Sequence, residues 1–170
     1  MNKYDPNKFV ESVDPPTKYL TFGCWIYLVP QYEPQSVLIL GFAGGTVAGL
    51  IRLLYGNVPI YAVDIEPCGP KYGVNFIQAN AKEFVKTCGH FDTVIVDLFI
   101  KGATKVPDFV TKEEFVNDLT KIANYIIVNT MGEPDMSSYR HLKQIAAFKP
   151  PRLINKIYYF EINKIPNLYL

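Results

Sequence analysis

Residues 36–64, SVLILGFAGGTVAGLIRLLYGNVPIYAVD, contain the pattern that decides the fold. Val37–Leu40 is short and wholly apolar, as expected for a buried parallel strand. A glycine-rich turn over residues 41–45 follows, then a helical segment over 45–54 and a second apolar strand over 59–64, which ends on a carboxylate. A strand, a turn, a helix and a second strand in this order predict a Rossmann-like, doubly wound α/β fold.

The turn and the carboxylate together predict a nucleotide-type ligand. Gly41, Gly44 and Gly45 carry no side chains, so a ligand can approach the backbone of the turn. Asp64 lies at the carboxyl end of the second strand, where such folds bind the hydroxyls of an adenosine ribose. Ala43 and Thr46 stand where the dinucleotide fingerprint has glycine, which favours an adenosyl cofactor without a pyrophosphate. Tight packing of helix on strand is the alternative explanation for the glycines.

Composition limits the domain organisation and the redox setting. A chain of 170 residues with 49% hydrophobic content is expected to form one domain over residues 17–170, preceded by a polar arm over residues 1–16. The three cysteines form no C-x-x-C pair, which favours reduced thiols and a cytoplasmic location. With only two histidines besides, no metal centre is expected.

Charge and hydropathy give no indication of a membrane or nucleic-acid partner. The net charge is +1, with Lys and Arg spread along the chain, so nucleic-acid binding is unsupported. No apolar stretch approaches the ~20 residues that span a bilayer, and the first 16 residues lack the apolar core of a signal peptide. The oligomeric state stays open, with a homodimer as one possibility.

The remaining segments predict a seven-stranded, mostly parallel sheet. Only nine residues, 65–73, precede the next apolar run, too few for a crossover with a full helix. Two terminal strands joined by a short link must be antiparallel. The predicted strands are 37–40, 59–64, 74–78, 91–97, 125–129, 156–162 and 167–170.

Helices are predicted between these strands and ahead of them. Thr111 and Glu114 form a capping-box pattern at the start of a helix that runs to about Ile122. The other predicted helices are 17–29, 45–54, 80–87 and 134–148.

Five segments resemble, in order, the motifs of one family. They are VLILGFAGGTVAGLIR (37–52), YAVDIEP (61–67), QANAKEFV (78–85), FDTVIVDLF (91–99) and VPDFVTKEEF (106–115). Together they are similar to the spermidine synthase-like branch of class I S-adenosylmethionine-dependent methyltransferases. The resemblance implies an S-adenosylmethionine (SAM) cofactor and a class I methyltransferase sheet with an antiparallel C-terminal strand.

The same resemblance assigns expected roles to the turn and to the ends of the next two strands. Gly41, Ala43 and Gly45 would form the turn beneath the aminoacyl arm of the cofactor, and Asp64 would bind the ribose hydroxyls. Asn80 stands where the family has an Asp that binds the adenine amino group, and Asn brings an acceptor oxygen without a charge. Ala81 would offer its backbone amide to the adenine ring.

Asp97 aligns with the acid that takes a proton from the attacking amine in polyamine-forming members. Such enzymes also need further carboxylates to neutralise a polyamine. Ile100 replaces the family's Asp, and residues 18–30 contain no carboxylate, so aminopropyl transfer is disfavoured. Three roles for Asp97 stay open. It could act as a base, it could hold the methionyl amino group of the cofactor, or it could simply cap the end of its strand.

Two function classes follow from the sequence. The first is a SAM-dependent methyltransferase with an unidentified acceptor, in which Asp97 is the candidate catalytic residue. The second is a non-catalytic scaffold that keeps the fold and binds a nucleoside or a protein.

Overall fold

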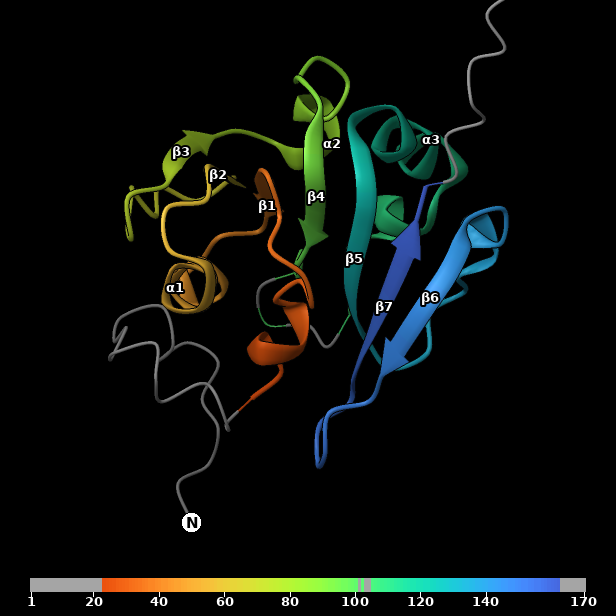
Figure 1. Ribbon diagram of the computed structural model, residues 1–170. Coiled ribbons are helices and arrows are strands. Elements are labelled where there is room, and N and C mark those ends of the chain that lie inside the picture. The colour runs from red at the N-terminus through yellow and green to blue at the C-terminus, as the bar shows by residue number, and fades with distance from the viewer. Residues whose placement is uncertain (1–22, 101, 103–104, 163–170) are drawn as a thin grey trace, which may run out of the picture.

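The computed structural model describes residues 23–100, 102 and 105–162, which form a seven-stranded sheet (Figure 1). The strand order is β3-β2-β1-β4-β5-β7-β6. All neighbours are parallel except β7, which is antiparallel to both β5 and β6. This arrangement confirms the predicted fold class. The strands are β1 (Val37–Leu40), β2 (Ile60–Asp64), β3 (Asn75–Gln78), β4 (Phe91–Val96), β5 (Ala123–Met131), β6 (Lys143–Phe148) and β7 (Asn155–Glu161).

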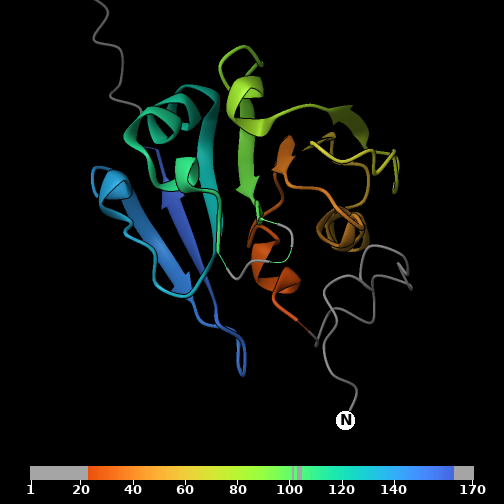
Figure 2. The ribbon, with the colours of Figure 1, turned by 180° about the vertical axis from the view of Figure 1, so that it is seen from behind.

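Short helices cover both faces of the sheet. One face carries α1 (Thr46–Tyr55) and the 3₁₀ turn η3 (Trp25–Leu28), which lie in front of the sheet in Figure 1. Seen from behind in Figure 2, the other face carries α2 (Ala81–Phe84) and α3 (Glu113–Ile122), together with the 3₁₀ turns η4 (Asp108–Thr111) and η5 (Ser137–Tyr139). Among the described residues, no helix has the length and apolarity needed to cross a membrane.

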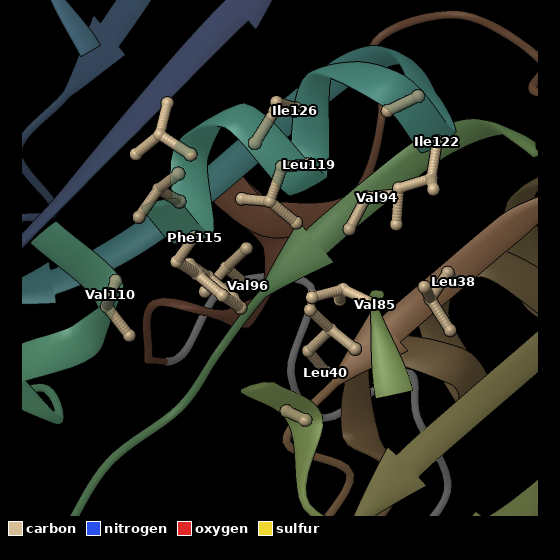
Figure 3. Packing of buried hydrophobic residues seen from close by; sticks show 14 of the residues in the cluster. Leu38, Leu40, Val85, Val94, Val96, Val110, Phe115, Leu119, Ile122 and Ile126 are labelled. Carbon is tan, nitrogen blue, oxygen red and sulfur yellow. The ribbon is translucent and has the colours of Figure 1, made fainter. Parts of the chain in front are cut away.

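The α3 face of the core follows from the spacing of apolar residues in α3. Phe115, Leu119 and Ile122 recur at helical spacing and are buried against β4 and β5 (Figure 3). Val94 and Val96 of β4 face them from the sheet. Each fully buried side chain of this size contributes about 1.5–3 kcal/mol by leaving water. This packing fixes β4, and with it the start of the segment that carries Asp97.

The opposite face is closed by η3 rather than by the helix predicted over residues 17–29. In the described part of that range, only Trp25–Leu28 form a helical turn, of 3₁₀ type, so the prediction is wrong there, and residues 17–22 lie outside the described residues. The Tyr159 hydroxyl lies 2.8 Å from the carbonyl oxygen of Tyr27 and 2.7 Å from that of Val29. These carbonyls therefore contact a side chain of β7 instead of continuing a helix.

The predicted helix over residues 134–148 is wrong. The chain forms η5 and then the edge strand β6, which pairs antiparallel with β7. Phe148 packs on Tyr159 and Tyr27, with ring centroids 5.5 and 5.9 Å apart. Backbone pairing with β7 and these ring contacts override a helical local preference. The strand predicted over 156–162 is confirmed as β7, whereas the one over 167–170 lies outside the described residues.

The start of α3 also differs from prediction. Thr111 ends η4, where its hydroxyl donates to the carbonyl oxygen of Asp108 at 3.3 Å. The helix begins at Glu113, and Lys112 occupies the N-cap without a side-chain bond. The capping box is therefore absent, and Glu113 and Glu114 stabilise the first turn through the helix dipole instead. The predicted helix over 80–87 shortens to α2.

Residues 65–73 contain no helix, as predicted, and an arginine holds them instead. Arg52 of α1 donates from Nε to the carbonyl oxygen of Tyr72 at 2.9 Å and from Nη2 to that of Gly73 at 3.2 Å. Its Nη1 donates to the carbonyl oxygens of Gly56, at 3.0 Å, and of Val58. One guanidinium thus ties the end of α1 and the short crossover together.

We expect Arg52→Met to loosen this crossover. The substitution keeps the apolar stem and removes the donors to four carbonyl groups, so the free energy of unfolding should fall by about 1–3 kcal/mol. Urea denaturation measures the loss, and hydrogen exchange should speed up most at the amides around residues 72–74. The exposed Arg140→Met is the matched control and should change neither. Equal effects of the two variants would contradict the assigned role of Arg52.

Candidate functional site

The carboxyl ends of β1, β2 and β4 meet at the turn over residues 41–45. Gly41 has φ +91°, and a Cβ there would lie 2.2 Å from the carbonyl oxygen of Asp97. The turn therefore passes directly against the backbone that follows β4, which only glycine permits. Gly45, with φ +78°, is the N-cap of α1. The predicted turn residues and Asp97 are thus adjacent.

Asp64 fixes the conformation of this turn. Its Oδ2 accepts hydrogen bonds from the backbone amides of Phe42 at 2.8 Å and Ala43 at 2.9 Å. Its Oδ1 accepts from the amide of Glu66 at 3.0 Å. These bonds hold Ala43 in the left-handed region, at φ +44°. A carboxylate has about four acceptor positions, so three bonds leave capacity for a ligand hydroxyl.

Asn80 and Ala81 lie one strand further along the same edge. The amide of Ala79 donates to the carbonyl oxygen of Asp64 at 3.0 Å, which brings the end of β3 beside Asp64. Asn80 is the N-cap of α2, and its Oδ1 accepts from the amide of Lys82 at 2.9 Å. Its side-chain oxygen is therefore already engaged, which the sequence did not indicate. Ala81 is the first residue of α2, a position whose amide has no partner within the helix.

Asp97 is a partly buried carboxylate with a raised pKa. Burial raises the pKa to about 6, the negative charge of Asp64 adds to the rise, and a hydrogen bond from Asn129 opposes it. That bond runs from Nδ2 of Asn129 to Oδ1 of Asp97 at 2.8 Å. A carboxylate of this pKa is mostly ionised at neutral pH and still accepts protons better than an ordinary Asp.

A row of amide side chains, which sequence reasoning missed, supports Asp97. Asn155 donates from Nδ2 to Oδ1 of Asn129 at 3.0 Å, and both residues are buried. Nδ2 of Asn129 also lies 3.7 Å from Sγ of Cys24. Burial of the Cys24 thiol, together with the negative charge of Asp97, raises its pKa to about 12. The available signal was the polar Asn129 at the end of the apolar run 125–128, since Asn is depleted in strands.

A small pocket of about 50 Å³ lies between the turn and η3. It is lined by Trp25, Ile39, residues 41–48 and Asp97. Sites for small organic ligands measure roughly 300–1,000 Å³, so this pocket alone does not enclose a nucleoside. Within the described ranges, no group of three or more His, Cys, Asp or Glu side chains is arranged to hold a metal ion.

Comparison with known proteins identifies the fold. The sequence matches no protein-family model and no curated protein. Human methyltransferase-like protein 13, crystallised with SAH, is similar in structure, with a TM-score of 0.65 and 13% identity over 96% of this chain and 81% of that one. A SAM-dependent methyltransferase from Aquifex aeolicus has a TM-score of 0.58 and 14% identity over 94% and 100% of the two chains.

A probable spermidine synthase from Corynebacterium glutamicum is also similar, with a TM-score of 0.62 and 15% identity over 74% of this chain and 56% of that one. These likenesses, together with the strand order, show that the chain has the class I SAM-dependent methyltransferase fold. The fold named by the sequence resemblance is therefore confirmed.

We expect Gly41→Ala to destabilise the protein far more than Gly69→Ala. Both glycines have positive φ, but a Cβ at Gly69 meets nothing within 4 Å, whereas at Gly41 it meets the backbone of Asp97. Gly69→Ala should therefore lower the free energy of unfolding by about 1 kcal/mol, through backbone strain alone. Gly41→Ala should lower it by about 3 kcal/mol or more, because the β1 and β4 ends must separate. Equal losses in thermal or urea unfolding would contradict this close approach.

The raised pKa of Asp97 predicts a specific pH dependence. The protonated carboxyl favours the folded state, so this stabilisation is complete below about pH 4 and is lost as pH rises through about 6. Asp97→Asn keeps an acceptor for Asn129 and removes the charge. Above pH 7 the variant should gain about 1–3 kcal/mol in unfolding free energy relative to the native chain, and near pH 4 it should gain much less. Urea titrations at both pH values measure the difference, and a constant difference would contradict the pKa shift.

Proposed function

We propose that this protein is a SAM-dependent methyltransferase whose cofactor lies along the turn over residues 41–45. One observation carries the proposal. Asp64 clamps the turn through two amides and keeps acceptor capacity at the edge where a ribose would lie. Asn80 and Ala81 come after the next strand, β3, at the start of α2, where the adenine would lie. The similar human protein crystallised with SAH supports this assignment.

The chemistry of the residues fits this cofactor. The turn offers small residues at positions 41 and 43–45, so its backbone is open to the aminoacyl arm. The pocket of about 50 Å³ beside it suits an arm rather than a whole nucleoside, which would lie along the strand edge. When bound, SAM supplies an electrophilic methyl group that leaves sulfur as the acceptor's lone pair forms the new bond. Asp97 lines the same pocket and would accept the proton that the acceptor loses.

Aminopropyl transfer to a polyamine is not the proposed reaction. Putrescine carries two positive charges, and removing each from water costs several kcal/mol unless carboxylates are near. Ile100 stands where the family has a second acid, and Asp64 is bound to the turn. Asp97 is thus the available carboxylate on the described part of the pocket wall.

The second candidate function is a scaffold that has kept the fold without catalysis. The small volume of the pocket, with Trp25 on its wall, favours it, as does the engagement of Asn80 in capping α2. Such a protein would bind a nucleoside or a protein partner and would not turn over SAM.

Calorimetric titration with SAM, SAH and methylthioadenosine tests the cofactor assignment. We expect SAM and SAH to bind and Asp64→Asn to weaken binding by on the order of 1.5–3 kcal/mol, since a charged acceptor is lost. Thermal unfolding of Asp64→Asn shows whether the turn survives. Asp118→Asn on α3, where Asp118 pairs with Lys121 away from the pocket lining, is the matched control and should keep full affinity.

Two outcomes separate the alternatives. Methyl transfer from SAM to components of a cell extract would favour the enzyme, and its abolition by Asp97→Asn would assign the base. Binding of methylthioadenosine alone, without turnover, would favour the scaffold. Release of methylthioadenosine from decarboxylated SAM and putrescine would overturn the exclusion of aminopropyl transfer.

A further inference from the structure

We propose that Asn129 is a positioning residue, which holds one oxygen of Asp97 and leaves the other for a hydrogen-bond donor on the methyl acceptor. The inference rests on the proposed function for its catalytic part. The contact between Asn129 and Asp97 can itself be tested without a cofactor.

Strand register brings the three side chains into one row. Val96 of β4 pairs with Val128 of β5, so Asp97 and Asn129 are the next residues along and share a face. Asn129 in turn pairs with Ile157 of β7, and Asn155 lies two residues away on the same face. The row therefore crosses three strands, and each strand is fixed by its own backbone ladder. A longer side chain on a loop would not hold the carboxylate so rigidly.

Hydrogen-bond direction determines what the row can offer a ligand. Asn129 uses its Nδ2 donor on Asp97 Oδ1, at 2.8 Å, and its Oδ1 acceptor on Asn155, at 3.0 Å. Asn129 is only 1% exposed, so its amide has no access to water as an alternative partner. Among the described residues, Asn129 is the donor recorded on the Asp97 carboxylate, and it contacts Oδ1. Asp97 lines the pocket beside the turn and Trp25, so we assign its second oxygen, Oδ2, as the acceptor that a ligand would meet there.

This arrangement limits the class of acceptor. A group that meets Oδ2 must carry a hydrogen to donate, so an amine or amide nitrogen or a hydroxyl fits, whereas a carboxylate or a carbonyl oxygen is repelled. Asp64 contributes negative charge to the same edge and the Cys24 thiol stays protonated beside it, so the local charge also favours a neutral or cationic acceptor.

The test is a titration of the Asp97 carboxyl carbon by NMR in the cofactor-free protein. The native midpoint should lie near pH 6. Asn129→Leu removes the donor to the ionised carboxylate, so the midpoint should rise by about one pH unit. Asn129→Asp keeps the shape and places a second carboxylate on Asp97, so the midpoint should rise further. Asn155→Leu breaks the same kind of bond one step away and should move the midpoint by less than a third of a unit.

A midpoint unmoved in both Asn129 variants, or moved equally by Asn155→Leu, overturns the positioning role. Should Asn129→Leu fail to fold, Asn129→Asp gives the same decision. Once a substrate is in hand, Asn129→Leu should lower kcat at least tenfold with little change in the KM for SAM, and the acidic limb of the pH profile should move with the NMR midpoint. If the NMR midpoints shift as expected but no methyl transfer is found, the role of Asn129 is confirmed and the proposed function is refuted. Failure of the positioning role and failure of the proposed function are therefore distinguishable. Turnover of a carboxylate acceptor would refute the acceptor class.

Discussion

The carboxylate of Asp64 is the interaction on which the site depends. A tight turn with Gly41, Ala43 and Gly45 in left-handed conformations leaves the backbone amides of Phe42 and Ala43 to be satisfied by a side chain. Asp64, at the end of the neighbouring strand β2, accepts a hydrogen bond from each of these two amides. The two bonds satisfy the donors and hold the ends of β1 and β2 together at that edge. Everything that a ligand would meet there, including Asp97 against Gly41, is placed relative to this clamp.

Single side chains replace helices in two places in this small fold. Arg52 binds the carbonyl oxygens of Tyr72 and Gly73 where a crossover helix would otherwise order residues 65–73, and it also binds those of Gly56 and Val58. Tyr159 and Tyr55 contact carbonyls of residues 27–30 and so hold η3 over β5 and β7. Charged or hydroxyl donors to these carbonyls compensate for missing helical bonds, and they matter most at the buried Val29 and Val58, because an unpaired buried carbonyl is costly. The result is a full seven-stranded sheet with few long helices among the described residues.

The site divides into two chemical halves. On the side of β2 and β3, backbone amides and Asp64 suit a neutral nucleoside with hydroxyls. On the side of β4, β5 and β7, Asp97, Asn129 and Asn155 form a buried polar row that ends in a carboxylate of raised pKa. Burial makes such a row expensive to build unless each bond is satisfied, and it also makes the row rigid. Catalysis by proximity, which methyl transfer requires, benefits from that rigidity.

The sequence alone determined the alternation of buried strands, the glycine turn and the two carboxylates at strand ends, because each depends on local periodicity and on residue types that suit few backbone conformations. It also determined that residues 65–73 lack a crossover helix, since nine residues are too few for a crossover that contains a full helix. Tertiary structure decided the rest. Residues 143–148 form a strand rather than a helix because β7 offers a backbone partner and aromatic contacts. Residues 25–28 form a single turn, and the Tyr159 hydroxyl, far along the chain, bonds the carbonyl oxygens of Tyr27 and Val29. Asn129 became part of the site only through the register of β4, β5 and β7, which no local pattern encodes.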